Sequence, residues 1–285
     1  MKYRLRHVTR YRYAEPVDLA AHLLHLTPRT LPQQTVLAAS LTALPEPARA
    51  VTRADHFGNT AGWLFLDAPH DRFAVTLQAE VAVAFPAPPP AAQTLPWEQV
   101  AASGMADEAA EFAFASPLVP AEPGAGGYAA ASFPAGRPVL AGLLDLTARI
   151  HRDFTFRPGV TTVATPVARV LAQRAGVCQD FAHLMIAGLR ALGLPARYVS
   201  GYVRTHPRPG EAARRGADQS HAWVGAWLGP GRGWVDLDPT NDLVVREEHV
   251  VLGWGRDFGD VSPLRGVILG GGEHSVAASV ELDAI

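Results

Sequence analysis

The segment Gly176-Val-Cys178-Gln-Asp180-Phe-Ala-His183 holds the only cysteine of this chain, at the start of a predicted helix over residues 177–192. A glycine precedes this helix, and Gly193 and Pro195 follow it as stop signals. A thiol in the first turn of a helix faces unpaired backbone N–H groups and the positive end of the helix dipole, which favour the thiolate. Chemistry is therefore expected to begin at Cys178. The apolar stripe that predicts the helix consists of Val177, Phe181, Leu184, Met185, Leu189 and Leu192.

The chain that follows this helix predicts an antiparallel sheet. Three strands are expected over residues 196–204, 221–228 and 234–238. A polar loop at 206–219 separates the first two, and a glycine-rich turn at 229–233 joins the last two. In an antiparallel pair joined by a tight turn, the start of one strand lies beside the end of the next. His221 and Asp238 are thus predicted neighbours in an α+β core.

These residues provide the three groups that nucleophilic attack on an acyl carbon requires. Cys178 would be the nucleophile, His221 the base that moves its proton, and Asp238 the carboxylate that orients the base. Asp236 competes for the last role, because it shares a face of the same strand. Asp238 is preferred because it stands nearer the strand end and is followed by Pro239.

Three stretches resemble the signature motifs of the transglutaminase-like superfamily, in their usual order: Gly176–His183, His221-Ala-Trp223-Val, and Trp234-Val-Asp-Leu-Asp238-Pro-Thr240. This resemblance implies a papain-like fold and a Cys-His-Asp triad at Cys178, His221 and Asp238. Three more stretches resemble bacterial transglutaminase-like proteins, which carry a β-rich N-terminal domain: Arg10–Tyr13, Asp55–Asn59 and Gly255–Pro263.

The first part of the chain predicts β-structure. Residues 3–13 and 62–66 are expected to pair with an alternating strand over 73–85, in a sandwich or open barrel. Turn signals stand at Glu15-Pro16, Gly58-Asn59 and Pro69-His70, and residues 19–26 fit either a strand or a helical turn. The proline-rich run after residue 85 marks a boundary. The expected domains are a β-rich domain at 1–86, a transglutaminase-like catalytic domain at 87–250, and C-terminal strands at 251–285 whose partner sheet stays open.

Four helices are expected between the boundary and the cysteine. They cover residues 96–102, 107–115 with Asp107 as N-cap, 138–153, and 166–174 after an N-cap at Thr165. The stretch 117–137 is rich in Pro, Gly and Ala, which favours a surface loop.

Composition excludes several classes of function. The 285 residues carry a net charge of −2 without a long run of Lys or Arg, so no nucleic-acid partner is expected. Charged and polar residues interrupt every apolar stretch before the ~20 positions that a membrane helix needs. A single cysteine cannot form an internal disulfide, and the N-terminal residues lack the pattern of a signal peptide, so a cytoplasmic location is expected. The oligomeric state is left open.

Other polar residues receive weaker assignments. His183 stands five positions after the cysteine, on another face of the helix, and is expected to support the site or the core. Cys178, His183, His206 and His221 lack the spacing of a zinc site, so neither a metal nor another cofactor is expected. Animal transglutaminases have a tryptophan upstream of the cysteine that holds the oxyanion, whereas no Trp lies here between Trp97 and Cys178. The backbone N–H of Cys178, with Gln173 or Gln179, is the candidate replacement.

The sequence therefore predicts cysteine-dependent acyl transfer or hydrolysis at a peptide or carboxamide bond, such as that of Gln, through a thioester. The acyl acceptor would be water or an amine, with water as the default. The rival hypothesis is a non-catalytic module that binds peptides or proteins on a transglutaminase-like scaffold.

Overall fold

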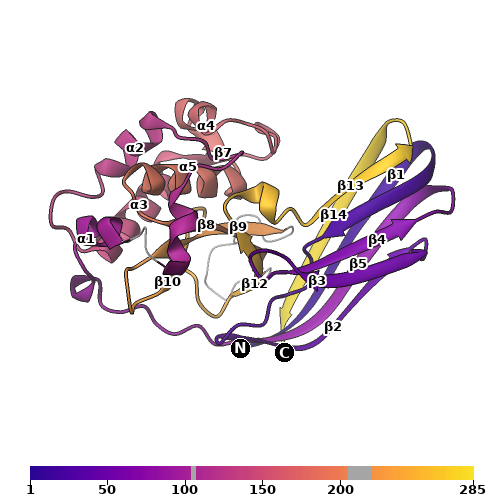
Figure 1. Ribbon diagram of the computed structural model, residues 1–285, viewed down its shortest axis with the longest axis horizontal. Coiled ribbons are helices and arrows are strands. Elements are labelled where there is room, and N and C mark those ends of the chain that lie inside the picture. Colours follow the sequence, from indigo (N-terminus) through magenta and orange to yellow (C-terminus); the bar gives the residue numbers. More distant parts are fainter. Residues whose placement is uncertain (104–106, 205–219) are drawn as a thin grey trace.

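The computed structural model describes residues 1–103, 107–204 and 220–285, and it divides into a helix-rich half and a half made of one curved sheet (Figure 1). The predicted α+β class, with a β-rich N-terminal part before a core in which a Cys-bearing helix packs on an antiparallel sheet, is confirmed. The expected loop at 206–219 and the zinc candidate His206 lie outside the described residues.

The N-terminal half is an open antiparallel sheet built around the long first strand, β1 (Lys2–Leu24). The first half of β1 lies between β5 and β14, and its second half lies between β4 and β13. The expected arrangement was a sandwich or an open barrel, and the observed one is a single open, curved sheet (Figure 1). Its other strands are β2 (Gln34–Leu44), β3 (Arg49–Ala54), β4 (Thr60–Leu66), β5 (His70–Val83), β13 (Leu264–Gly270) and β14 (His274–Ala284).

Two sequence expectations for this sheet change. The predicted turn at Glu15-Pro16 is wrong, because β1 continues through it with a shift of register between Arg12 and Val17. A proline lacks the N–H that a ladder needs, and an irregular point in a strand tolerates that loss. The undecided stretch after residue 18 is the second half of β1. Strands β2 and β3 were missed, because both are largely exposed and carry little apolar alternation.

The C-terminal segment divides between the two sheets. β12 (His249–Gly255) pairs with β8 (Ala196–Val203) of a second sheet, which lies in the predicted catalytic domain and is called the catalytic sheet below, whereas β13 and β14 return to β1. The two ends of the chain therefore lie together (Figure 1), and the N–H of Ile285 donates to the carbonyl of Lys2 at 3.0 Å.

The helix-rich half contains a second antiparallel sheet, in the order β11-β10-β9-β8-β12. Its other strands are β9 (His221–Trp227), β10 (Trp234–Asp238) and β11 (Leu243–Val244). A short parallel pair stands beside it, β6 (Thr155–Phe156) with β7 (Ala175–Gly176). The helices are α1 (Trp97–Ser103), α2 (Pro123–Ala130), α3 (Val139–Asp153), α4 (Val167–Gln173) and α5 (Cys178–Ala191), with 3₁₀ turns η1 (Ala91–Gln93), η2 (Asp107–Ala113) and η3 (Phe258–Asp260).

Three helix predictions need correction. Helix α2 lies inside the stretch predicted to be a loop, because its small residues suit close packing on α5: a Cβ on Gly126 would lie 2.8 Å from the Cβ of Ala191. The segment after residue 107 is a 3₁₀ helix, and the proposed Asp107 cap lies outside the described side chains. Helix α4 begins at Val167, one residue later than predicted, and Thr165 accepts a hydrogen bond from the N–H of Thr162 instead of capping it.

Helix α5 is buried on all sides from Asp180 to Arg190, not only along one stripe. One face packs against β8 and β9, and the other helices cover the rest. The face of the catalytic sheet opposite α5 carries Val199 and Val251, which pack with Leu31 from the N-terminal part of the chain. Tyr202, near the end of β8, shares a further core with Leu5 of β1. The catalytic sheet is thus held from both faces, which fixes the strands that carry the site.

A buried asparagine joins the two halves. The side chain of Asn59 donates to the carbonyl of Trp254 at 2.8 Å and accepts from the N–H of Trp254 at 2.9 Å. Arg29 also donates to Asn59, and its guanidinium lies 3.7 Å from the centre of the Trp254 ring. The stretch Asp55–Asn59 therefore binds the catalytic sheet through β12.

Replacing Asn59 by Ala should lower the free energy of unfolding by about 3 kcal/mol, because it leaves buried N–H and C=O groups of β12 without partners. Urea denaturation would measure this loss. His56 in the same turn is 74% exposed in its side chain, so His56→Ala is the matched control and should change stability by less than about 0.5 kcal/mol. Equal stability of the two variants would contradict this role.

Candidate active site

The turn before Cys178 is fixed by Asp180. Its carboxylate accepts from the N–H of Val177 at 2.7 Å and from the hydroxyl of Thr161 at 2.7 Å. A side chain at Gly176 would collide with this carboxylate, which explains the glycine there. Burial raises the pKa of Asp180, and the two hydrogen bonds partly oppose that rise. Cys178 is consequently held as the first residue of α5, half-buried.

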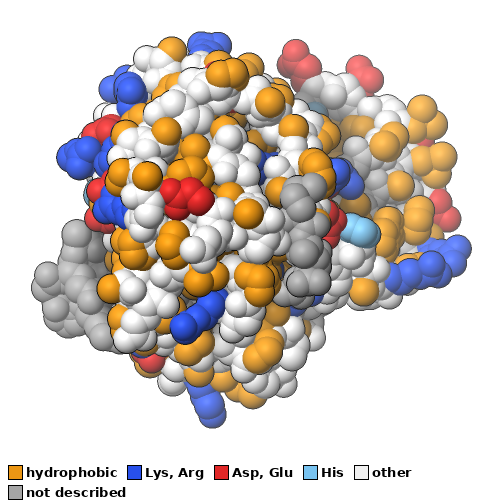
Figure 2. Space-filling view, turned by 60° about the vertical axis from the view of Figure 1, so that its left-hand side comes forward, with side chains coloured by type: hydrophobic (Ala, Val, Ile, Leu, Met, Phe, Trp, Pro, Cys, Tyr) orange, Lys and Arg blue, Asp and Glu red, His pale blue; other side chains and the backbone are white. Residues whose placement is uncertain are grey.

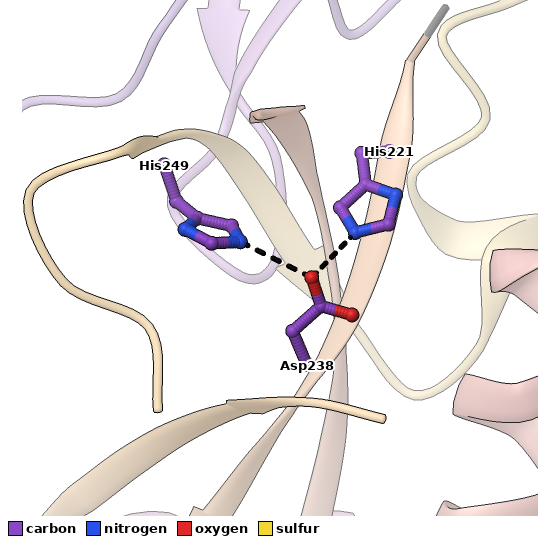
Figure 3. A group of neighbouring side chains, drawn as sticks. All are labelled: His221, Asp238 and His249. Carbon is purple, nitrogen blue, oxygen red and sulfur yellow. Dashed lines mark hydrogen bonds and ion pairs between the residues drawn. The ribbon is translucent and has the colours of Figure 1, made fainter. Parts of the chain in front are cut away.

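His221 and Asp238 are in direct contact, as their positions on adjacent strands predict. Nε2 of His221 lies 2.8 Å from Oδ2 of Asp238, and both side chains are fully buried (Figure 3). Burial alone would lower the pKa of His221, but the Asp238 carboxylate and, less strongly, Cys178 raise it to about 10. The imidazole is therefore held in its protonated form across the neutral range.

Asp238 is surrounded by donors. Its Oδ1 accepts from the N–H groups of Thr240 and Asn241 at 2.9 and 3.2 Å, and its Oδ2 also accepts from the Asn241 side chain at 2.8 Å. Burial would raise the pKa of Asp238, but His221 and then His249 hold it well below its ordinary range. The Pro-Thr-Asn sequence after Asp238 supplies the further hydrogen bonds that hold the carboxylate in place.

The other ring nitrogen of His221, Nδ1, is not used by Asp238. Nδ1 is buried and has no hydrogen-bond partner among the described residues. Cys178 and His221 both line a cavity of about 420 Å³, and Cys178 is one of the groups that raise the pKa of His221. Nδ1 is therefore the nitrogen available to exchange a proton with the thiol.

A second histidine, His249 at the start of β12, was not found from the sequence. Its Nε2 lies 3.3 Å from the same Oδ2 of Asp238, and Figure 3 shows the two imidazoles on either side of the carboxylate. The His249 ring also stands edge-on to Trp223, with ring centres 5.2 Å apart. No motif signals it, because it joins the site only through the pairing of β12 with β8.

Replacing His249 by Leu should slow acylation of Cys178 about tenfold, because Asp238 loses one donor that fixes its orientation while the triad stays complete. Stopped-flow release of 4-nitrophenolate from 4-nitrophenyl acetate measures this rate. His274 on the exposed β14 is the control, and His274→Leu should acylate at the unchanged rate. An unimpaired His249→Leu variant would remove His249 from the site.

Asp236, the competing carboxylate, does not reach His221. It accepts from Nε1 of Trp223 at 3.0 Å and lies 3.8 Å from the guanidinium of Arg197. That guanidinium is sandwiched between the rings of Trp234 and Trp254. Asp236 therefore belongs to a structural stack that ties β8, β9, β10 and β12 together.

The other candidates occupy supporting places. Nε2 of His183 accepts from the N–H of Phe258 at 3.2 Å, and its ring packs on Tyr198, so His183 holds the wall of the cavity. Gln173 donates to the carbonyl of Ala175 at 2.7 Å and does not line the cavity. Gln179 lines it, but its amide donates to the carbonyl of Val163 at 3.1 Å.

One group of the described residues has the composition of a metal site. The ligand-type atoms of His221, Asp238 and His249 lie within 4.8 Å of one another. The hydrogen bonds among them account for this approach, so the geometry requires no ion. Cys178 and His183, which the zinc hypothesis would need, are not part of this group.

The surface around the helix-rich half is mixed in character. In Figure 2 the basic, acidic and apolar side chains of the described residues are interspersed over the visible face. Among the described residues, no helix combines the length and apolar character needed to cross a membrane.

Comparisons with known proteins agree with the motifs. The model of the bacterial transglutaminase-like N-terminal region matches residues 3–82, and that of the transglutaminase-like superfamily matches residues 134–239. An uncharacterised protein of Mycobacterium tuberculosis is 42% identical over 294 residues, an alignment that spans 100% of this chain and 92% of that protein. One of Mycobacterium leprae is 32% identical over 283 residues, covering 98% of this chain and 97% of its own length.

Two further relatives bear on chemistry and fold. A protein-glutamine gamma-glutamyltransferase of Pseudomonas aeruginosa is 35% identical over 135 residues, which is 42% of this chain and 20% of that enzyme. The crystal structure of a proposed cysteine protease from Cytophaga hutchinsonii superposes with a TM-score of 0.79 at 24% identity, covering 99% of this chain and 90% of its own. That likeness concerns the fold.

Proposed function

Since this chain belongs to the transglutaminase-like superfamily, we propose that it is an enzyme that uses Cys178 for acyl transfer or hydrolysis at peptide or carboxamide bonds. The observation that carries the proposal is the 2.8 Å contact between His221 and Asp238, which leaves Nδ1 of His221 unbonded in the cavity that Cys178 lines. A base that is oriented on one side and open on the other is what a thiol nucleophile requires.

In the proposed reaction, the sulfur of Cys178 attacks the carbonyl carbon of the substrate and a C–S bond forms. The C–N bond breaks, and the amine leaves with the proton that Nδ1 of His221 took from the thiol. Asp238 holds the proton on Nε2, which keeps Nδ1 in the correct tautomer. The thioester then passes to an acceptor.

Water is the acceptor that we favour. Cys178 is half-buried rather than enclosed, so bulk water reaches the thioester unless the substrate excludes it. The product would then be a free carboxylic acid, and the enzyme would act as a peptidase or amidase on a peptide or protein. The alternative acceptor is an amine, and the similarity to a protein-glutamine gamma-glutamyltransferase supports it. The cytoplasmic location stays a prediction.

Iodoacetamide labelling at about neutral pH tests the nucleophile. Cys178 should react quickly in the wild-type protein and at least about tenfold more slowly in His221→Ala, because the cation that stabilises the thiolate is lost. His183→Asn is the control, since His183 supports the wall without contacting His221. A Cys178 that does not react, or that is labelled at the same rate in the wild-type protein and in His221→Ala, would favour a non-catalytic binding module.

Mass spectrometry of a glutamine-containing peptide library, incubated with the enzyme and a primary amine, separates the two acceptors. Hydrolysis of a side-chain carboxamide adds one mass unit to the peptide, whereas transfer adds the mass of the amine less ammonia. Loss of both products in Cys178→Ala assigns them to this site.

A further inference from the structure

Two hydroxyl groups of β8 line the active-site cavity without a partner. Tyr198 and Ser200 are both 3% exposed, and both contribute to the wall that Cys178 and His221 share. Neither hydroxyl makes a hydrogen bond within the described residues. Because the two residues are two positions apart on one strand, their side chains point to the same face of the sheet, the face covered by α5.

The Tyr198 ring is held firmly in place. His183 packs on it with ring centres 5.2 Å apart, and Phe258 meets it edge-on at 6.2 Å. The hydrogen bond from the N–H of Phe258 to His183 fixes those two neighbours relative to each other. Burial, and then the negative charge at Cys178, raise the pKa of Tyr198 well above its ordinary value, so its hydroxyl stays a donor.

Apart from Cys178, His221, Gln179 and Ser220, the remaining described residues of the cavity wall are apolar. Among the described residues no Lys, Arg, Asp or Glu lines it, and the amide of Gln179 is used by the carbonyl of Val163. Neither of the two hydroxyl oxygens is among the sealed, unpaired atoms, so both face the cavity, where a bound molecule can take the place of water as their partner. The apolar part consists of Phe156, Pro158, Val163, Val177, Ala222, Phe258 and Pro263.

We propose that the hydroxyls of Tyr198 and Ser200 bind the acyl oxygen of the substrate that reacts with Cys178, and that the cavity accepts an uncharged acyl group. This inference rests on the proposed function. It assigns to β8 the donor role that the sequence sought in Gln173 or Gln179. Donors aimed at the acyl oxygen strengthen their bonds as negative charge develops on it during the attack.

Two reagents separate this role from a general effect on the thiol. In 4-nitrophenyl acetate, Cys178 attacks the carbonyl carbon, the C–S bond forms, the C–O bond breaks, and 4-nitrophenolate leaves. In methyl methanethiosulfonate, which has no carbonyl group, the same sulfur attacks the methylthio sulfur, a new S–S bond forms, the S–S bond of the reagent breaks, and methanesulfinate leaves. Tyr198→Phe should slow acylation by about tenfold or more and leave disulfide formation unchanged, with Ser200→Ala acting in the same direction.

Tyr202→Phe is the matched control on the same strand. Its hydroxyl contacts Nδ1 of His7 at 2.7 Å, outside the cavity, so both rates should stay at the wild-type value. Acylation at the wild-type rate in both Tyr198→Phe and Ser200→Ala would overturn the proposal, and so would an equal loss of both rates. A wild-type protein whose Cys178 reacts with neither reagent would instead refute the proposed function.

The second part of the test compares esters with an uncharged and a negatively charged acyl group. Wild-type acylation by 4-nitrophenyl pentanoate should exceed that by mono-4-nitrophenyl glutarate about tenfold or more, because the described wall offers the glutarate carboxylate no Lys or Arg in exchange for the water that it loses. Equal rates for the two esters would overturn the assignment of an uncharged acyl group.

Discussion

Replacing Asp238 by Asn should lower the rate of Cys178 acylation by roughly 10³–10⁴-fold with the fold intact. The Asn oxygen can still accept from the N–H groups of Thr240 and Asn241, but its NH₂ then faces Nε2 of His221. His221 must turn Nε2 into an acceptor and carry its proton on Nδ1, so it can no longer take the proton of the thiol. Release of 4-nitrophenolate measures the rate, and circular dichroism reports the fold.

The matched control is Asp236→Asn, two residues earlier on the same strand. Asp236 contacts Trp223 and Arg197 and not His221. The acylation rate of this variant should therefore stay within about threefold of the wild-type rate, while its free energy of unfolding falls. If Asp236→Asn were the inactive variant and Asp238→Asn the active one, the orienting carboxylate would be Asp236.

The free energy of unfolding should fall steeply between about pH 6.5 and pH 10. The pKa of His221 is about 10 in the folded protein against an ordinary value of 6.5, with burial opposed by Asp238 and Cys178. A group whose pKa is higher in the folded state contributes its stabilisation fully below the unfolded value and loses it as the pH rises through the folded value. The loss is at most about 1.4 kcal/mol per pH unit, and several kcal/mol in total.

Urea denaturation at a series of pH values would measure this dependence, and His221→Gln is its reference. Lysine and tyrosine titrations affect both proteins, so the difference between wild type and His221→Gln isolates the imidazole together with the thiol that is coupled to it. That difference should shrink towards alkaline pH. A difference that stays constant from about pH 6.5 to pH 10 would mean that no proton is held on His221 by folding.

The helix and strands that carry the candidate site could be predicted from the sequence because their signals are local. A periodic apolar stripe, followed by the stop residues Gly193 and Pro195, predicts the helix at Cys178. The contact of His221 with Asp238 follows from the tight turn between their two strands. Asp238 could be preferred to Asp236 from the sequence because it lies nearer the end of the strand. In each case a few neighbouring residues determine the geometry.

The features that escaped prediction depend on distant pairing. His249 reaches Asp238 only because β12 pairs with β8, about 50 residues earlier in the chain. Tyr198 and Ser200 look like ordinary strand residues until the cavity around them is assembled. Helix α2 was taken for a loop because glycine and alanine weaken a helix in isolation, whereas here they permit close contact with α5.

The return of β13 and β14 to β1 has a consequence for biosynthesis. A ribosome makes β1 first, yet two of the four strands that flank it, β13 and β14, are made last. The backbone groups of β1 that pair with these two strands therefore stay unpaired until almost the whole chain has been synthesised. Such pairings close long loops and form slowly. During translation an unpaired β1 is therefore exposed to mispairing and chaperone binding, and any stop codon before residue 264 would leave that edge open permanently.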